Sequence, residues 1–112
     1  MPAPIVRLLR GDTWQRAWII RYADESPVDL TGAAARLQVR GADDVVAMQA
    51  STADGRLATQ PLDGRIDLVM PAAVTEIAVG NYWFDLEVTY PDGVRITYEH
   101  SPLIIIQDIA RD

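Results

Sequence analysis

The sequence contains no cysteine and no lysine, and both absences narrow what the protein can be. Without cysteine, its 112 residues cannot build a disulfide framework or a thiolate metal site. All ten basic residues are arginine, and 16 acidic residues outnumber them to give a formal net charge of −6. Proteins that bind nucleic acid need a clustered surplus of basic side chains to neutralise phosphates. The charge balance therefore argues against nucleic acid as a partner.

Long apolar runs are also missing. No segment approaches the roughly 20 apolar residues of a membrane-spanning helix, so we expect no membrane partner. The apolar run at the start of the chain is short and is interrupted by Arg7, so we expect no secretory signal peptide. We assign residues 1–112 to a single domain, because a chain of this length buries roughly 65% of its unfolded surface when it folds.

Residues that could carry chemistry are scarce. His100 is the only histidine, whereas a nucleophilic triad would also need a hydroxyl nucleophile and an orienting acid. Its neighbour Glu99 would face the other side of a strand, because successive side chains alternate. A zinc site would need three or four ligands, and adjacent acids in turns lack the spaced oxygens of a calcium site. We therefore expect no catalytic residue, metal or cofactor, and we do not expect an enzyme.

Three Asp-Gly dipeptides each precede an apolar segment with alternating pattern: Asp54-Gly55, Asp63-Gly64 and Asp92-Gly93. Asp-Gly favours tight turns because glycine adopts the positive φ that such turns need and aspartate tolerates it. The dipeptides indicate antiparallel strands joined by hairpins.

Alternating or continuous apolar patterns predict seven or eight short strands. They cover residues 13–22, 33–40, 45–50, 56–60, 65–70, 81–90, 94–100 and 103–106. We expect Pro102 to separate the last two segments. Residues 71–79 begin with proline and predict one or two helical turns that connect two strands. Strands of this length and spacing predict an all-β fold: an immunoglobulin-like antiparallel β-sandwich with one short helical crossover.

Tyr82 lies just after this crossover. It can form a tyrosine corner, with its hydroxyl bonded to the upstream backbone, or it can be an ordinary half-buried side chain.

Six short motifs occur in one order along the chain, and the order is more specific than any single motif. They are Arg10-Gly11-Asp12-Thr13, the segment 27–40 that begins Pro27-Val28-Asp29-Leu30-Thr31-Gly32, Gly64-Arg65-Ile66, Pro71-Ala72-Ala73, the segment 80–87 that begins Gly80-Asn81-Tyr82, and Pro91-Asp92-Gly93. In this order they resemble the immunoglobulin-like N-terminal domain of phage baseplate upper proteins and related small phage tail-associated proteins. The resemblance covers nearly the whole chain.

The resemblance implies a non-enzymatic structural or assembly protein of a phage or prophage tail or baseplate. Its partners would be other tail or baseplate proteins or further copies of itself. It would act through protein–protein contacts, in the virion or in the host cytoplasm.

Trp83, Ile104 and Ile106 are the candidate interface residues. Trp83 alternates with apolar neighbours that suit a core, so it would point outward. Ile104 and Ile106 alternate with Leu103 and Ile105, so the last strand is apolar on both faces. In one reading, residues 4–9 or a loop covers the second face. In the other, another subunit covers it, because exposed apolar patches mark partner sites.

Trp14, Arg16 and Trp18 form a weaker candidate ligand face, because they share one side of an early strand. In one reading they are core residues, with the Arg16 head group reaching the rim. In the other they form an exposed platform of stacked indole and guanidinium groups. The second reading would suit an adhesin module that binds a carbohydrate or a receptor.

Overall fold

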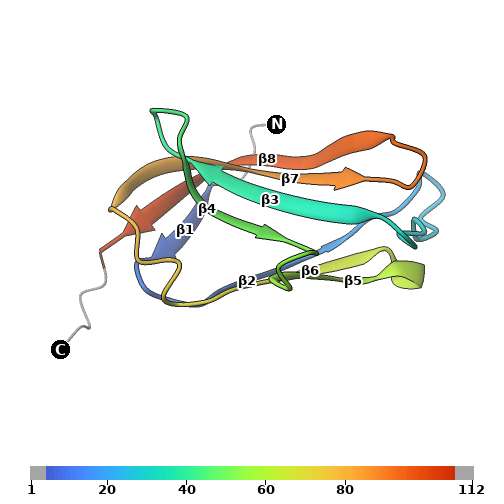
Figure 1. Ribbon diagram of the computed structural model, residues 1–112, viewed down its shortest axis with the longest axis horizontal. Coiled ribbons are helices and arrows are strands. Elements are labelled where there is room, and N and C mark those ends of the chain that lie inside the picture. Colours follow the sequence, from blue (N-terminus) through green and yellow to red (C-terminus); the bar gives the residue numbers. More distant parts are fainter. Residues whose placement is uncertain (1–4, 108–112) are drawn as a thin grey trace.

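Two β-sheets packed face to face make up the fold in a computed structural model that describes residues 5–107 (Figure 1). The larger sheet has the strand order β1-β8-β7-β3-β4, and the smaller has β2-β6-β5. The strands are β1 (Val6–Leu9), β2 (Trp14–Ile19), β3 (Ala34–Arg40), β4 (Val46–Ser51), β5 (Leu57–Gln60), β6 (Arg65–Met70), β7 (Gly80–Thr89) and β8 (Arg95–Ile106). The predicted immunoglobulin-like β-sandwich is confirmed, with eight strands in the described residues.

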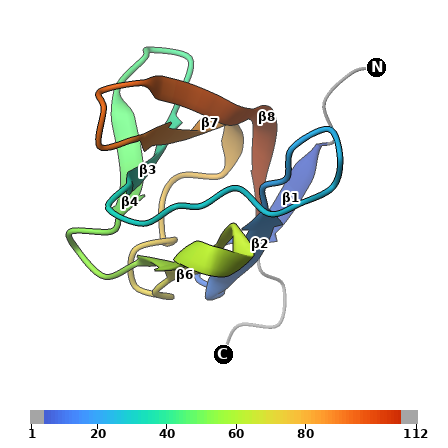
Figure 2. The same ribbon diagram turned by 90° about the vertical axis from the view of Figure 1, so that its right-hand side faces the viewer.

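One strand pair departs from the antiparallel pattern. β1 runs parallel to the end of β8, with Val6 opposite Leu103 and Leu9 opposite Ile106. The end-on view places β1 at the side of the sandwich, between β8 of the larger sheet and β2 of the smaller one (Figure 2). β1 thus covers only the last four positions of one edge of β8.

The core follows from the alternation of side chains along each strand. Inward-facing positions of both sheets carry fully buried aliphatic side chains, and Trp14 meets Phe84 edge-on with ring centroids 5.3 Å apart. Burial of each large aliphatic side chain contributes roughly 1.5–3 kcal/mol. The main members are Leu37, Val39, Ile66, Leu68, Leu86, Val88, Leu103 and Ile105.

The three Asp-Gly dipeptides lie in turns, and two of them close hairpins as predicted, but Asp54-Gly55 connects β4 to β5 in the other sheet. Gly64 shows why one of these turns requires glycine. Its φ is 63°, and a Cβ at this position would lie 2.4 Å from the carbonyl oxygen of Ile20. The Gly64 carbonyl also accepts a hydrogen bond of 2.8 Å from the Ile20 amide. This turn therefore fixes the start of residues 20–33, the connection from β2 to β3 across the end of the sandwich (Figure 2).

The expected break at Pro102 is wrong, because β8 continues through it as a single strand of 12 residues. Pro102 lies opposite Trp83 of β7, and β1 begins to pair with β8 only at the next residue, Leu103. A strand tolerates proline at an unpaired edge, where its missing amide removes no ladder hydrogen bond.

The crossover at residues 71–79 contains one hydrogen-bonded turn, the shorter of the two expected lengths. The amide of Thr75 approaches the carbonyls of Pro71 and Ala72 at 3.3 and 3.2 Å. The fully buried Thr75 hydroxyl donates to the carbonyl of Asp12 at 2.7 Å, which ties the crossover to the β1–β2 turn. The one helical element assigned in the described residues is a 3₁₀ turn, η1 (Pro61–Asp63), between β5 and β6.

The tyrosine corner is present. The Tyr82 hydroxyl donates to the carbonyl of Ala78, four residues upstream, at 2.6 Å. This hydrogen bond anchors the end of the crossover to the start of β7.

Candidate interaction surfaces

The predicted interface residues share one face, the outer face of the larger sheet. Trp83 lies opposite Pro102, and Ile104 and Ile106 follow on the same side of β8. β1 adds Leu9, which lies opposite Ile106. Trp83 is 50% exposed and Leu9 is 42% exposed, while the others are half-buried. We call this set the outer apolar patch: Leu9, Trp83, Pro102, Ile104 and Ile106.

β1 extends the sheet and does not lie over the patch. Arg7 and Leu9 flank Ile104 and Ile106 in register, as strand neighbours do. Residues 6–9 therefore do not provide the cover that one reading of the sequence expected, and Pro4 lies outside the described residues. The exposed Trp83 and Leu9 side chains show that the face is open over the described part of the chain.

Polar side chains border the patch where β7 and β3 continue away from it. The Trp83 indole stacks on the His100 imidazole, with centroids 4.8 Å apart and an angle of 12° between the planes. His100 Nδ1 contacts Asp85 Oδ1 across the strand pair. Arg40, opposite Trp83, donates to Gln38 Oε1 at 2.9 Å. The face thus combines an apolar centre with a polar margin, as protein interfaces commonly do.

The structure separates the three residues of the weaker candidate face. Trp14 is only 5% exposed and belongs to the core, as the first reading expected. Arg16 and Trp18 are partly buried, and both donate hydrogen bonds to Glu99 on β8. A solvent-exposed platform of all three side chains does not form, because Trp14 packs against Phe84 between the sheets.

Glu99 closes one open side of the sandwich. Its carboxylate accepts from Arg16 Nη2, Trp18 Nε1 and Ser101 Oγ at 2.7, 2.7 and 2.8 Å. Partial burial alone would raise the pKa of the Glu99 carboxyl, but these hydrogen bonds outweigh it, so the pKa lies below its ordinary value. The carboxylate therefore stays ionised and links β2 to β8. β2 is an edge strand of the smaller sheet, and in the described residues β8 is unpaired on one side before residue 103, where its pairing with β1 begins.

The sequence carries a signal for this cluster, which the strand predictions did not use. Glu99 has the same parity as the buried Leu103 and Ile105, so it is an acid at an inward position. Arg16 is likewise a cation at an inward position of another strand. Two opposite charges at inward positions of edge strands are candidates for a cross-sheet ion pair.

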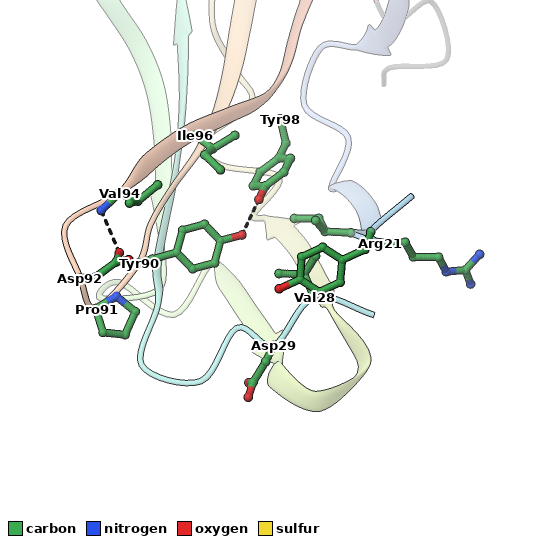
Figure 3. A pocket seen from close by; sticks show the side chains of 11 residues that line it. Arg21, Val28, Asp29, Tyr90, Pro91, Asp92, Val94, Ile96 and Tyr98 are labelled. Carbon is green, nitrogen blue, oxygen red and sulfur yellow. Dashed lines mark hydrogen bonds between the residues drawn. The ribbon is translucent and has the colours of Figure 1, made fainter. Parts of the chain in front are cut away.

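A tyrosine-lined pocket of about 600 Å³ lies between residues 20–29 and the β7–β8 hairpin (Figure 3). Its walls come from residues 20–29 and from the hairpin that joins β7 to β8. The hydroxyl groups of Tyr90 and Tyr98, which both line it, form a hydrogen bond with each other. Sequence reasoning missed this pocket because its two sides are far apart in the chain. The full lining is Ile20, Arg21, Tyr22, Val28, Asp29, Tyr90, Pro91, Asp92, Val94, Ile96 and Tyr98.

Two other kinds of site are absent from residues 5–107. This part of the chain contains no group of three or more histidine and acidic side chains placed to hold a metal ion. Within the same range, no helix is long and apolar enough to cross a membrane.

Comparisons with known proteins include distant structural matches. No family model matches the chain, and no curated protein matches it. CopC from Methylosinus trichosporium OB3b aligns over 70% of this chain and 67% of its own, with 14% identity and a TM-score of 0.45. The extracellular domains 3–5 of Drosophila OTK align over 94% of this chain but only 34% of theirs, with 17% identity and a TM-score of 0.40. These TM-scores are too low to support an argument from either structure. The fold assignment therefore rests on the strand order and on the tyrosine corner.

Proposed function

We propose that this chain is a non-enzymatic structural protein of a phage or prophage tail or baseplate, and that it acts through protein–protein contacts at the outer apolar patch. The observation that carries the contact site is the half-exposed Trp83 indole, opposite Pro102 and on the same sheet face as Ile104 and Ile106. Tryptophan is enriched among the residues that dominate binding energy at interfaces. Exposed apolar side chains gathered on one face mark partner sites on soluble proteins, and here the exposed Arg7 and Asn81 flank Ile104 on either side.

The order of the six sequence motifs supports the phage assignment. Several of these motifs occupy positions that the fold constrains strongly. Gly64 packs against the Ile20 backbone, the Pro71 turn lies in the crossover, and Gly80 begins the strand that carries the tyrosine corner. These constraints account for the single motifs, so the proposal of a role in assembly rests on the order of the set and its likeness to tail-associated modules.

Recombinant protein tests the contact site directly. Multi-angle light scattering at micromolar concentration measures self-association, and co-purification from cells that produce tails measures binding to other tail components. We expect Trp83→Ser to weaken whichever association occurs. Val69→Ser is the matched control, because Val69 is 47% exposed on β6 of the smaller sheet.

The phage part of the proposal has its own test. Genes for tail, tape-measure or baseplate proteins should flank this coding sequence, and deletion of the gene should stop tail assembly. Flanking genes of unrelated function, with normal tails after deletion, would reject the assignment without affecting the contact site.

The alternative function, an adhesin module for a carbohydrate or a receptor, relied on an exposed Trp14–Trp18 face. Trp14 is buried, so this observation no longer favours it.

A further inference from the structure

The tyrosine-lined pocket exists because β8 is longer than its neighbour. β1 pairs only with residues 103–106, so the first half of β8 has no strand partner on that side. Residues 20–29 approach this half from the smaller sheet, and Val28 is tied to Ile20 by a backbone hydrogen bond of 2.9 Å. The space between them is the pocket of about 600 Å³, which lies within the range of ligand sites.

Aromatic rings with hydroxyl groups dominate this space. Tyr22, Tyr90 and Tyr98 all line it, and the Tyr22 side chain is 58% exposed at its mouth. Burial and the contact with Tyr98 raise the pKa of Tyr90, so its hydroxyl stays neutral. Aromatic faces carry negative quadrupole potential, and cations bind over them.

The charges at the rim have the same sign preference. Asp29 and Asp92 both line the pocket beside one basic residue, Arg21, and in Figure 3 the Arg21 and Asp29 head groups both extend away from the Tyr90–Tyr98 pair. The Asp29 and Asp92 carboxylates accept hydrogen bonds within their own turns, from Thr31 and from the Val94 amide. Hydrogen bonds from the Thr31 hydroxyl and amide lower the pKa of Asp29, so this carboxylate is ionised at neutral pH. The whole chain carries a net charge of −6, which adds to the attraction for a cation.

The aliphatic part of the lining selects among cations. Ile20, Val28, Val94 and Ile96 provide apolar walls beside the tyrosine rings. A long basic side chain suits this lining, because its methylene stem can pack on the apolar walls while its charged head group lies over the aromatic rings. A small hydrated metal ion would gain nothing from these walls.

We infer that this pocket binds an arginine or lysine side chain presented by another protein. The inference does not depend on the phage assignment or on the outer apolar patch, since the two surfaces lie on different parts of the sandwich.

The experiment is an NMR titration with the capped peptide acetyl-Gly-Arg-Gly-amide. The control peptide contains citrulline in place of arginine, because citrulline has nearly the same shape without the charge. We expect the arginine peptide to shift the signals of Tyr22, Tyr90, Tyr98 and Val94, and we expect the citrulline peptide to leave them nearly unchanged. Equal shifts with the arginine and citrulline peptides would show that charge is not recognised and would overturn the inference. The absence of shifts with both the arginine peptide and a matching lysine peptide would also overturn it.

Two variants separate binding from folding. Asp29→Asn removes the rim charge but keeps the side-chain oxygen that accepts hydrogen bonds from Thr31, so the turn should persist. We expect roughly two- to fivefold weaker binding of the arginine peptide. Asp24→Asn is the matched control, because Asp24 makes the same contacts to Ser26 but lies outside the pocket lining. Tyr22→Ala should weaken binding similarly, and wild-type affinity in both pocket variants would contradict the inference.

Discussion

At the scale of single residues, a few side chains and one glycine determine how the two sheets meet. Gly64 lets the backbone of one sheet approach the β2–β3 connection, and Glu99 joins the two sheets across their open side. Both positions were visible in the sequence, but only Gly64 was predicted in its role as a turn. Glu99 was expected to face away from His100, and it does, but its partners on β2 could not be named before the register was known.

Gly64→Ala should destabilise the protein strongly. The substitution forces a non-glycine residue to φ 63° and places Cβ 2.4 Å from a carbonyl oxygen. We expect a loss of at least about 2 kcal/mol in the free energy of unfolding, measured with urea. Gly55→Ala is the control, since Gly55 has φ 80° but a Cβ added there would meet no heavy atom within 4 Å. Equal losses in the two variants would show that the close approach is unimportant.

Glu99 should make stability depend on pH. Its folded-state pKa lies below the ordinary value, so its contribution is present above the ordinary pKa and is lost as the pH falls through the folded value. Glu99→Gln should therefore lower stability at neutral pH by about 2 kcal/mol and reduce the loss of stability as the pH falls below the ordinary glutamate pKa. Urea unfolding across this range measures both effects. An acid decline as steep as that of the wild type would argue against this role.

At the scale of elements, the sequence predicted seven of the eight strands but missed β1 and divided β8 in two. The segment 65–70 has the predicted bounds, and the crossover has its expected turn. The failure at Pro102 has a physical cause, because a proline breaks a strand only where its amide would be bonded, and that depends on the neighbouring strand. The parallel pairing of β1 was likewise not predictable, since local alternation carries no information about the partner strand.

The crossover provides a test of how these elements are connected. Thr75→Val keeps the size of a fully buried side chain but leaves the Asp12 carbonyl without its hydrogen bond from Oγ1. We expect about 1–3 kcal/mol of destabilisation in urea unfolding. Thr75→Ser, which retains the hydroxyl, should recover part of the loss. A serine variant less stable than the valine variant would mean that packing and not the hydrogen bond holds this segment.

At the scale of the whole molecule, the fold has two surfaces that are suited to partners. Three residues of the outer apolar patch, Trp83, Ile104 and Ile106, were proposed from alternation as outward-facing, whereas Leu9 and Pro102 join the patch only through the strand pairing. The tyrosine-lined pocket was not predicted, because it depends on the approach of residues 20–29 to β8 across the end of the sandwich. Parity predicts faces of a sheet, whereas a pocket requires knowledge of how the sheets are placed.

The measurement that tests the central claim most directly is the association state of wild-type protein, Trp83→Ser and Val69→Ser, by light scattering alone and with tail components. We predict that the wild type and Val69→Ser associate alike, and that Trp83→Ser binds at least roughly tenfold more weakly, as expected for an interface hot spot. Unchanged association of Trp83→Ser, or a wild type that binds neither itself nor any tail component, would contradict the claim.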